Sequence, residues 1–331
     1  MPLDFSLPLA RLKLLRSGAV MVRDDPAVLR VEGPGALTCL QGLLTQDLAA
    51  PGDGSLVYGA VLSPKGMIIA DAWVLREETG FILVLDSTAR AAMLSLLGRT
   101  LPPRLARTSD LSDGWSAIWM IGGAAPDRLA RALGREVPGA GKVLRTGPAG
   151  PILAGGTEPA PFRVVCLGPR ADLDAIAASF PVGTACCGTE ADLAATRVLA
   201  GWPTLYREID EKTLPQEVRF EEIGGVSYTK GCYTGQETVA RVHFRGHVNR
   251  NLRGVVLGGG EPPADRVLRA ADKEVGRLAT ALMLEDRVVG LALVRREVAN
   301  GAVLQAGSRE ARVVALPFGS EGLGVGDSGL G

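Results

Sequence analysis

The sequence predicts an α+β protein built from several domains, and three observations lead to this. The chain has 331 residues, and single hydrophobic cores seldom grow beyond about 250–300 residues. A strand, a glycine turn and a helix follow one another near residues 28–44, and the same order returns from residue 115. Short strand-like segments fill the chain from residue 236 onward, which is typical of a small barrel or sandwich.

Several features predict a cytoplasmic protein. No apolar run reaches the ~20 residues of a membrane span, and the N-terminus lacks the apolar stretch of a secretory signal. The five cysteines are odd in number and none has CxxC spacing, which argues for a reducing compartment and against a disulfide framework. The formal net charge is zero, so no overall field attracts nucleic acid or an anionic membrane.

The first predicted domain is discontinuous. Its first part, residues 1–47, contains a strand at 28–33 and a short helix at 36–45 whose leucines recur on one face. Its second part, residues 107–235, begins with the repeated order of strand, turn and helix. Because the two parts share a pattern, we predict that they are halves of one α/β domain.

Residues 48–106 are predicted to form a small α+β domain inserted between those halves. Two strand candidates, at 57–62 and 67–75, flank a Ser-Pro-Lys-Gly turn. Asp71 lies inside the second of these strands among apolar residues. A buried carboxylate must be paired or have a shifted pKa, so Asp71 is a candidate base or ligand-binding acid. The alternative is that Asp71 faces water on the polar side of its strand.

Residues 236–318 are predicted to form a C-terminal β-barrel domain. The segment 239–242 is strand-like in composition, and the candidates at 252–257 and 288–294 are rich in Val and Leu. Residues 319–331 are rich in glycine, which predicts a flexible tail.

The eight residues Lys230–Glu237, KGCYTGQE, are the strongest candidate for a functional site. Their two glycines, four positions apart, allow a sharp turn that can bring Lys230, Cys232 and Gln236 into one small volume. The stretch also separates an acidic segment from a basic one, since residues 240–253 hold four arginines and two histidines but no acid. The alternative is a plain glycine turn with a buried cysteine.

KGCYTGQE resembles the signature of the YgfZ-type branch of the glycine cleavage T-protein (GcvT, aminomethyltransferase-like) superfamily. Other landmarks of that family have counterparts in the same order, at residues 40–47 (LQGLLTQD), 62–66 (LSPKG), 200–203 (AGWP), 214–217 (LPQE), 275–276 and 291–296. The resemblance implies a three-domain cloverleaf around a central channel, in which related members bind tetrahydrofolate.

Two departures from the family pattern bear on function. Aminomethyltransferases of the superfamily carry paired acids where this chain has Ala70-Asp71, and a pterin-binding glutamate where it has Leu199. The resemblance therefore implies a folate-dependent accessory role in assembling or repairing iron–sulfur clusters, with an effect on tRNA modification through a client enzyme. The expected partners are a folate and iron–sulfur client proteins or their assembly machinery, with the chain itself a monomer.

The resemblance also gives the residues of the signature candidate roles. Neighbouring cations lower the pKa of a thiol, so Cys232 is a candidate nucleophile. Lys230 can pair with the glutamate tail of a folate, and Tyr233 can stack on a pterin. Gln236 and Glu237 can bond to the pterin edge. For Tyr233 and Glu237 the alternatives are core packing and an ordinary surface charge.

The basic segment after the signature leaves several interpretations open. Arg241 and Arg245 can line an anion-binding channel mouth or contact a partner, or they form a solvated face. No metal site is predicted from His243 and His247, because their surroundings are strand-like and no third ligand lies near. Two alternative functions are a folate-dependent one-carbon transferase acting through Asp71 and an RNA-binding module. No RNA-binding motif is present, so direct RNA binding is not expected.

Overall fold

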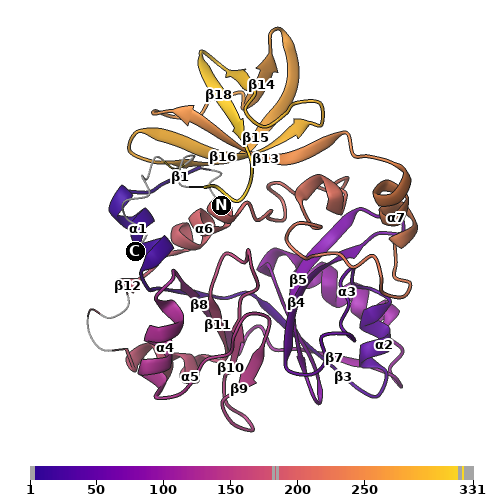
Figure 1. Ribbon diagram of the computed structural model, residues 1–331. Helices are drawn as coiled ribbons and strands as arrows, with labels where there is room; N and C mark the ends of the chain where they lie inside the picture. The colour runs from indigo at the N-terminus through magenta and orange to yellow at the C-terminus, as the bar shows by residue number, and fades with distance from the viewer. Residues whose placement is uncertain (1–3, 181–182, 184–185, 320–322, 324–331) are drawn as a thin grey trace.

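The computed structural model describes residues 4–180, 183, 186–319 and 323, which form three sheets with helices around them (Figure 1). Two sheets occupy the lower half of Figure 1 and the third lies above them. The helices are α1 (Leu9–Ser17), α2 (Ala36–Gln41), α3 (Arg90–Thr100), α4 (Ala125–Leu133), α5 (Arg170–Ala178), α6 (Glu190–Ala200) and α7 (Gln236–Arg245). The predicted flexible tail, residues 319–331, lies outside the described residues except for Gly319 and Leu323.

The first sheet is antiparallel, with its strands in the order β4-β5-β6-β3-β7. The strands are β3 (Ala27–Glu32), β4 (Ser55–Leu62), β5 (Ile68–Glu77), β6 (Gly80–Leu85) and β7 (Arg107–Asp110). The predicted domain boundary at residue 47 divides this sheet, because β3 pairs with β6 on one side and with β7 on the other. Residues 48–106 therefore do not make a sheet of their own.

The second sheet has the strand order β12-β2-β8-β11-β10-β9. Its strands are β2 (Val20–Asp24), β8 (Trp115–Ile121), β9 (Val143–Arg145), β10 (Ile152–Gly155), β11 (Val164–Pro169) and β12 (Cys186–Cys187). The two strand-turn-helix units predicted as halves of one α/β domain belong to different sheets, β3 with α2 in the first and β8 with α4 in the second.

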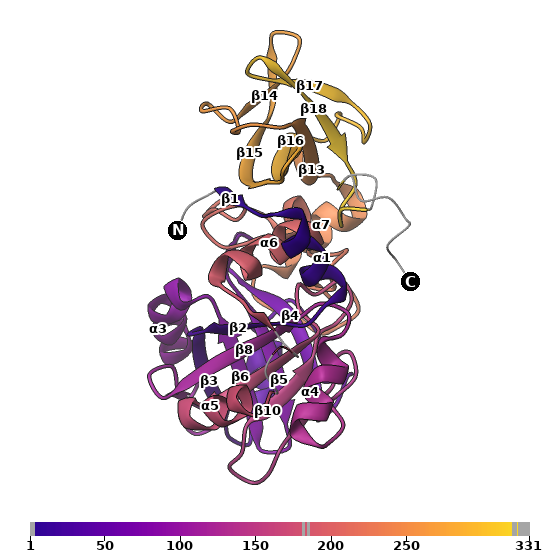
Figure 2. The same cartoon turned by 90° about the vertical axis from the view of Figure 1, so that its left-hand side faces the viewer.

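The third sheet closes into the predicted C-terminal barrel. It consists of β13 (Arg250–Gly258), β14 (Val267–Ala270), β15 (Lys273–Met283), β16 (Arg287–Arg295), β17 (Val303–Ala306) and β18 (Arg309–Val314). Closure follows because β15 pairs with β14 on one edge and with β16 on the other. Strand β1 (Asp4–Ser6) adds to β15 in parallel, so the first described strand joins the barrel (Figure 2).

The segment predicted as the first strand of the barrel domain is instead helix α7. Val239 and Val242 are β-branched, which favours a strand, but Glu237 in the first turn and His243 and Arg245 in the last turn suit the helix dipole. Because α7 ends at Arg245, His247 lies beyond it and the two histidines share no helix. No group of three or more His, Cys, Asp or Glu side chains suited to a metal occurs in the described part of the chain.

Candidate functional site

A cavity of about 360 Å³ lies where the three sheets meet. The first sheet contributes Asp71 and Trp73, the second contributes Trp119, and the barrel contributes Thr280 and Leu291. Helix α6 and the loop that follows it supply further lining residues, among them Leu193, Ala194, Arg197, Val198 and 202–207. Junctions of this kind between domains are common positions for small-molecule sites.

Aromatic rings form one wall of this central cavity. The indoles of Trp73 and Trp202 stack with centroids 5.1 Å apart and planes at 16°, and the Tyr58 ring lies 4.6 Å from Trp202. Three of the four tryptophans of the chain line the cavity. No sequence motif predicted these tryptophans as a site, although their rarity, in a chain with only 5% aromatic residues, is a signal that marks them.

Asp71 lies at the cavity wall and is held by a tyrosine. The Tyr58 hydroxyl donates to its Oδ2 at 2.8 Å, and burial raises the pKa of Asp71 above its ordinary value, although the Tyr58 hydrogen bond and the charge of Arg197 act in the opposite direction. Burial and the Asp71 charge raise the pKa of Tyr58 as well. Asp71 is therefore half-buried and paired with Tyr58, and its role as a base or ligand-binding acid stays a prediction.

Lys230 has a different environment from the predicted one. Its side chain is 8% exposed, and its Nζ donates to the carbonyl oxygens of Gln41, Leu44 and Gln46 at 2.9, 2.8 and 2.8 Å. An ammonium has three donors, so none remains for a folate tail. Burial lowers the pKa of Lys230 to about 8, against the opposing effect of Asp47. Lys230 thus fastens the signature to the end of α2.

The LQGLLTQD segment forms the other half of this attachment. The Thr45 hydroxyl donates to the carbonyl of Gly225 at 2.6 Å and accepts from the amide of Ala60 at 2.8 Å. Although burial raises the pKa of Asp47, hydrogen bonds from the amides of residues 49 and 50 and from Gln41 outweigh it and hold that pKa below its usual range. The amide of Thr234 donates to the carbonyl of Gly42 at 3.0 Å, so this segment also holds the signature in place.

The second glycine of the signature is required by its surroundings. Gly235 has φ +82°, and a Cβ there would lie 2.6 Å from the carbonyl oxygen of Ser63. The LSPKG turn between β4 and β5 thus packs directly against the start of α7.

Tyr233 is 7% exposed, and burial raises its pKa to about 12. Its ring therefore packs in the core and is not open to a pterin.

The structure divides the predicted site residues between two places. Asp71 lines the central cavity, but among the residues described no member of Lys230–Arg245 does. Cys232 is exposed, as are three other predicted site residues, Glu237, Arg241 and Arg245. Gln236 accepts the amide hydrogen of Tyr233 at 3.3 Å. The signature is therefore a surface segment with a buried anchor, separate from the cavity.

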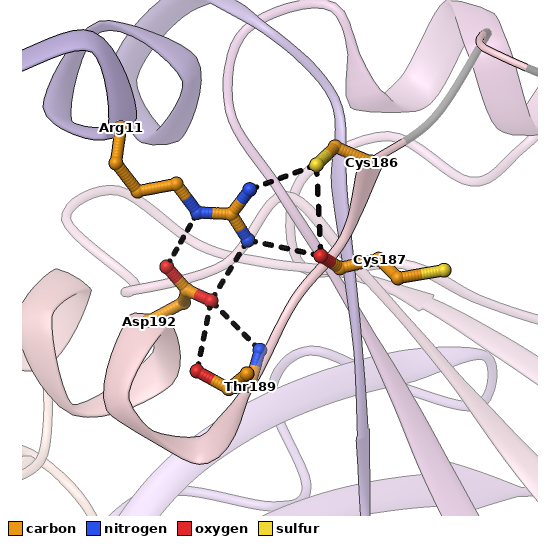
Figure 3. A network of polar contacts seen from close by, with 5 residues as sticks. All are labelled: Arg11, Cys186, Cys187, Thr189 and Asp192. Carbon is orange, nitrogen blue, oxygen red and sulfur yellow. Dashed lines mark hydrogen bonds and ion pairs between the residues drawn. The ribbon is translucent and has the colours of Figure 1, made fainter.

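A polar network holds α6 in position (Figure 3). This is the helix that contributes Arg197 to the lining of the cavity. Arg11 on α1 forms a two-point ion pair with Asp192 at 2.7 and 2.8 Å, and its Nη1 lies 2.8 Å from the Cys186 sulfur. Asp192 also accepts from Thr189 at the start of α6. Burial raises the pKa of Asp192, but the bonds from Arg11 and Thr189 outweigh it and lower the pKa. In Figure 3 the two adjacent thiols point in different directions.

Comparison with known proteins finds relatives that all point to the same superfamily. The model of the GCVT N-terminal domain matches residues 25–139. A tRNA-modifying protein YgfZ from Edwardsiella ictaluri is 30% identical over 237 residues, covering 70% of this chain and 69% of that protein. The human mitochondrial iron–sulfur cluster assembly factor IBA57 is 28% identical over 310 residues, covering 88% of this chain and 81% of its own.

The fold has a solved counterpart. The glycine cleavage system aminomethyltransferase T of Bartonella henselae superposes with a TM-score of 0.82, covering 94% of this chain and 89% of that one at 19% sequence identity. The multidomain fold predicted from the resemblance is thereby confirmed. In the described part of the chain, no helix is both long and apolar enough to span a membrane.

Proposed function

Because this chain belongs to the YgfZ-type branch of the glycine cleavage T-protein superfamily, we propose that it is a tetrahydrofolate-binding accessory factor for the assembly or repair of iron–sulfur clusters in client enzymes. The relatives' names supply the iron–sulfur and tRNA-modification context. The observation that carries the folate part is the central cavity, which is lined by the stacked indoles of Trp73 and Trp202 and by Asp71. Three further carboxylates also line it, those of Asp24, Asp86 and Glu190.

The chemistry of the cavity suits a pterin. Aromatic walls favour a flat heterocycle, and the carboxyl group of Asp71 can accept N–H groups from its aminopyrimidine edge. Leu199, where the family's aminomethyltransferases have glutamate, lines a neighbouring cavity of about 410 Å³. We therefore assign recognition of the pterin edge to Asp71.

The exposed thiol of Cys232 is proposed to act on a client protein and not on the folate. It lies on the surface, in a segment that does not line the central cavity. One cysteine cannot hold an iron–sulfur cluster alone, so any shared cluster needs the client's own ligands. The cluster is thus cargo and the folate is the resident small molecule.

Tryptophan fluorescence tests the folate part directly. Three indoles line the cavity, so tetrahydrofolate should quench the emission saturably, and Trp202→Phe should reduce the change. Emission that stays constant up to millimolar tetrahydrofolate would contradict the proposal. As a matched control, Trp115→Phe removes the one tryptophan that does not line the cavity and should leave the quenching unchanged.

Restoration of a client enzyme tests the accessory role. In a strain without its own YgfZ-type protein, the wild-type chain should restore the activity of an iron–sulfur enzyme, and Cys232→Ser should not. If Cys232→Ser restored the client enzyme as well as the wild type does, the proposed role of the thiol would be contradicted.

A second candidate function is folate-dependent one-carbon transfer with Asp71 as the base. The raised pKa of Asp71 at the cavity wall favours it, because a base with such a pKa can take up a proton from a bound amine. Turnover of a methylated amine with tetrahydrofolate, lost in Asp71→Asn, would support this function over the accessory role.

A further inference from the structure

The outer face of helix α7 lacks a partner within the described part of the chain. Val239 is the one residue of this helix that is fully buried, and Figure 1 shows α7 at the right-hand edge of the molecule. Its outward positions, Glu237, Arg241, Phe244 and Arg245, follow the spacing of one helical face. The phenyl ring of Phe244 is 68% exposed, more than any other large hydrophobic side chain among the residues described.

The rings of His243 and Tyr228 pack against this exposed phenyl ring. The imidazole of His243 stacks on Tyr228 with centroids 3.6 Å apart, and Phe244 meets His243 edge-on at 4.7 Å. Glu221 accepts from the Tyr228 hydroxyl at 3.2 Å and lies 3.4 Å from the His243 Nδ1. These contacts hold Phe244 outward on a fixed base, which limits the entropy lost when a partner covers it.

From this geometry we infer that the α7 face is the docking surface for the client protein, and that the client presents an apolar pocket for Phe244 flanked by carboxylates for Arg241 and Arg245. The inference rests on the proposed function. Among the described residues, neither arginine has an ion pair of its own, and aromatic and arginine side chains dominate binding hot spots. Cys232 lies only four residues before α7 begins.

The charges around this face favour a protein over a nucleic acid. Glu237 stands on the same face, and the exposed Glu221 lies 3.4 Å from His243 of the helix, so a polyphosphate backbone would meet two carboxylates. A protein surface can match mixed charges one by one, whereas a nucleic acid presents only anions to be neutralised.

Dependence on expression level separates docking from chemistry. Phe244→Ala and the double variant Arg241→Glu/Arg245→Glu should weaken docking roughly 30-fold, which is the effect of one strong hot spot. At low expression they should fail to restore the client enzyme, and at high expression they should restore it by mass action. Cys232→Ser should fail at both levels. Leu105→Ala and Arg99→Glu are matched controls. Both residues are exposed and distant in sequence from α7, so these variants should behave as the wild type.

Each other outcome has a definite meaning. If the wild type and the docking variants restore the client equally at low expression, the docking inference is overturned. If the wild type restores nothing, the proposed function itself is overturned. The melting temperature of each docking variant is expected to stay close to that of the wild type, because Phe244 and both arginines are exposed. Binding of single-stranded oligouridine that Phe244→Ala abolishes would assign the face to RNA and overturn the inference.

Discussion

The central cavity and the Lys230–Glu237 segment use their shielded charged side chains in opposite ways. Lys230 places all its donors on backbone carbonyls, so its charge stabilises the fold and has nothing left for a ligand. Asp71 receives one hydrogen bond from Tyr58 and otherwise faces a cavity. A buried charge with a complete set of partners points to structure, and an incompletely paired one at a cavity points to function.

Removing the charge of Lys230 should give the largest loss of stability. Lys230→Ala leaves three carbonyls without their donor, which should lower the free energy of unfolding by about 3 kcal/mol. Urea denaturation measures this. Lys65→Ala, an exposed lysine in the neighbouring turn, is the control and should change little. A loss for Lys230→Ala as small as that of the control would show that the ammonium is not an anchor.

Gly235→Ala tests whether the backbone of the signature is as constrained as its contacts indicate. The positive φ and the close approach of the Ser63 carbonyl should destabilise the protein by about 2 kcal/mol. Thermal unfolding compares it with Gly231→Ala, where a Cβ meets nothing within 4 Å. Equal melting temperatures for the two variants would contradict the proposed packing of the LSPKG turn.

Asp71→Asn should have the opposite sign at neutral pH. Because the folded-state pKa of Asp71 is raised, wild-type stability falls as pH rises from the unfolded value of about 4 through the folded one. The variant lacks this loss, so it should match the wild type in acid and exceed it at pH 7 by on the order of 1 kcal/mol. Unfolding free energies across this pH range provide the measurement, and a variant less stable than the wild type at pH 7 would refute it.

Local patterns in the sequence predicted most strands and the barrel, because alternation and turn residues are local properties. They did not predict that β3 pairs with β6 and β7, since the choice of neighbour depends on packing far along the chain. The segment that forms helix α7 resembles a strand because Val239 and Val242 are β-branched, although their spacing of three residues fits a helical face. The residue types of the segment KGCYTGQE predict a site there, but they could not distinguish a buried anchor, Lys230, from an exposed thiol, Cys232.

The wall of the cavity was only partly predictable. Asp71 could be found because a carboxylate in an apolar strand is unusual. Trp73, Trp119 and Trp202 come from three distant segments, and only the meeting of the sheets makes them one surface.

Calorimetric titration with tetrahydrofolate of the wild type, Cys232→Ser and Asp71→Asn tests the separation of the two regions most directly. We predict that Cys232→Ser binds as the wild type does and that Asp71→Asn binds at least about ten-fold more weakly, the equivalent of one charged hydrogen bond. Loss of binding in Cys232→Ser with full binding in Asp71→Asn would contradict it.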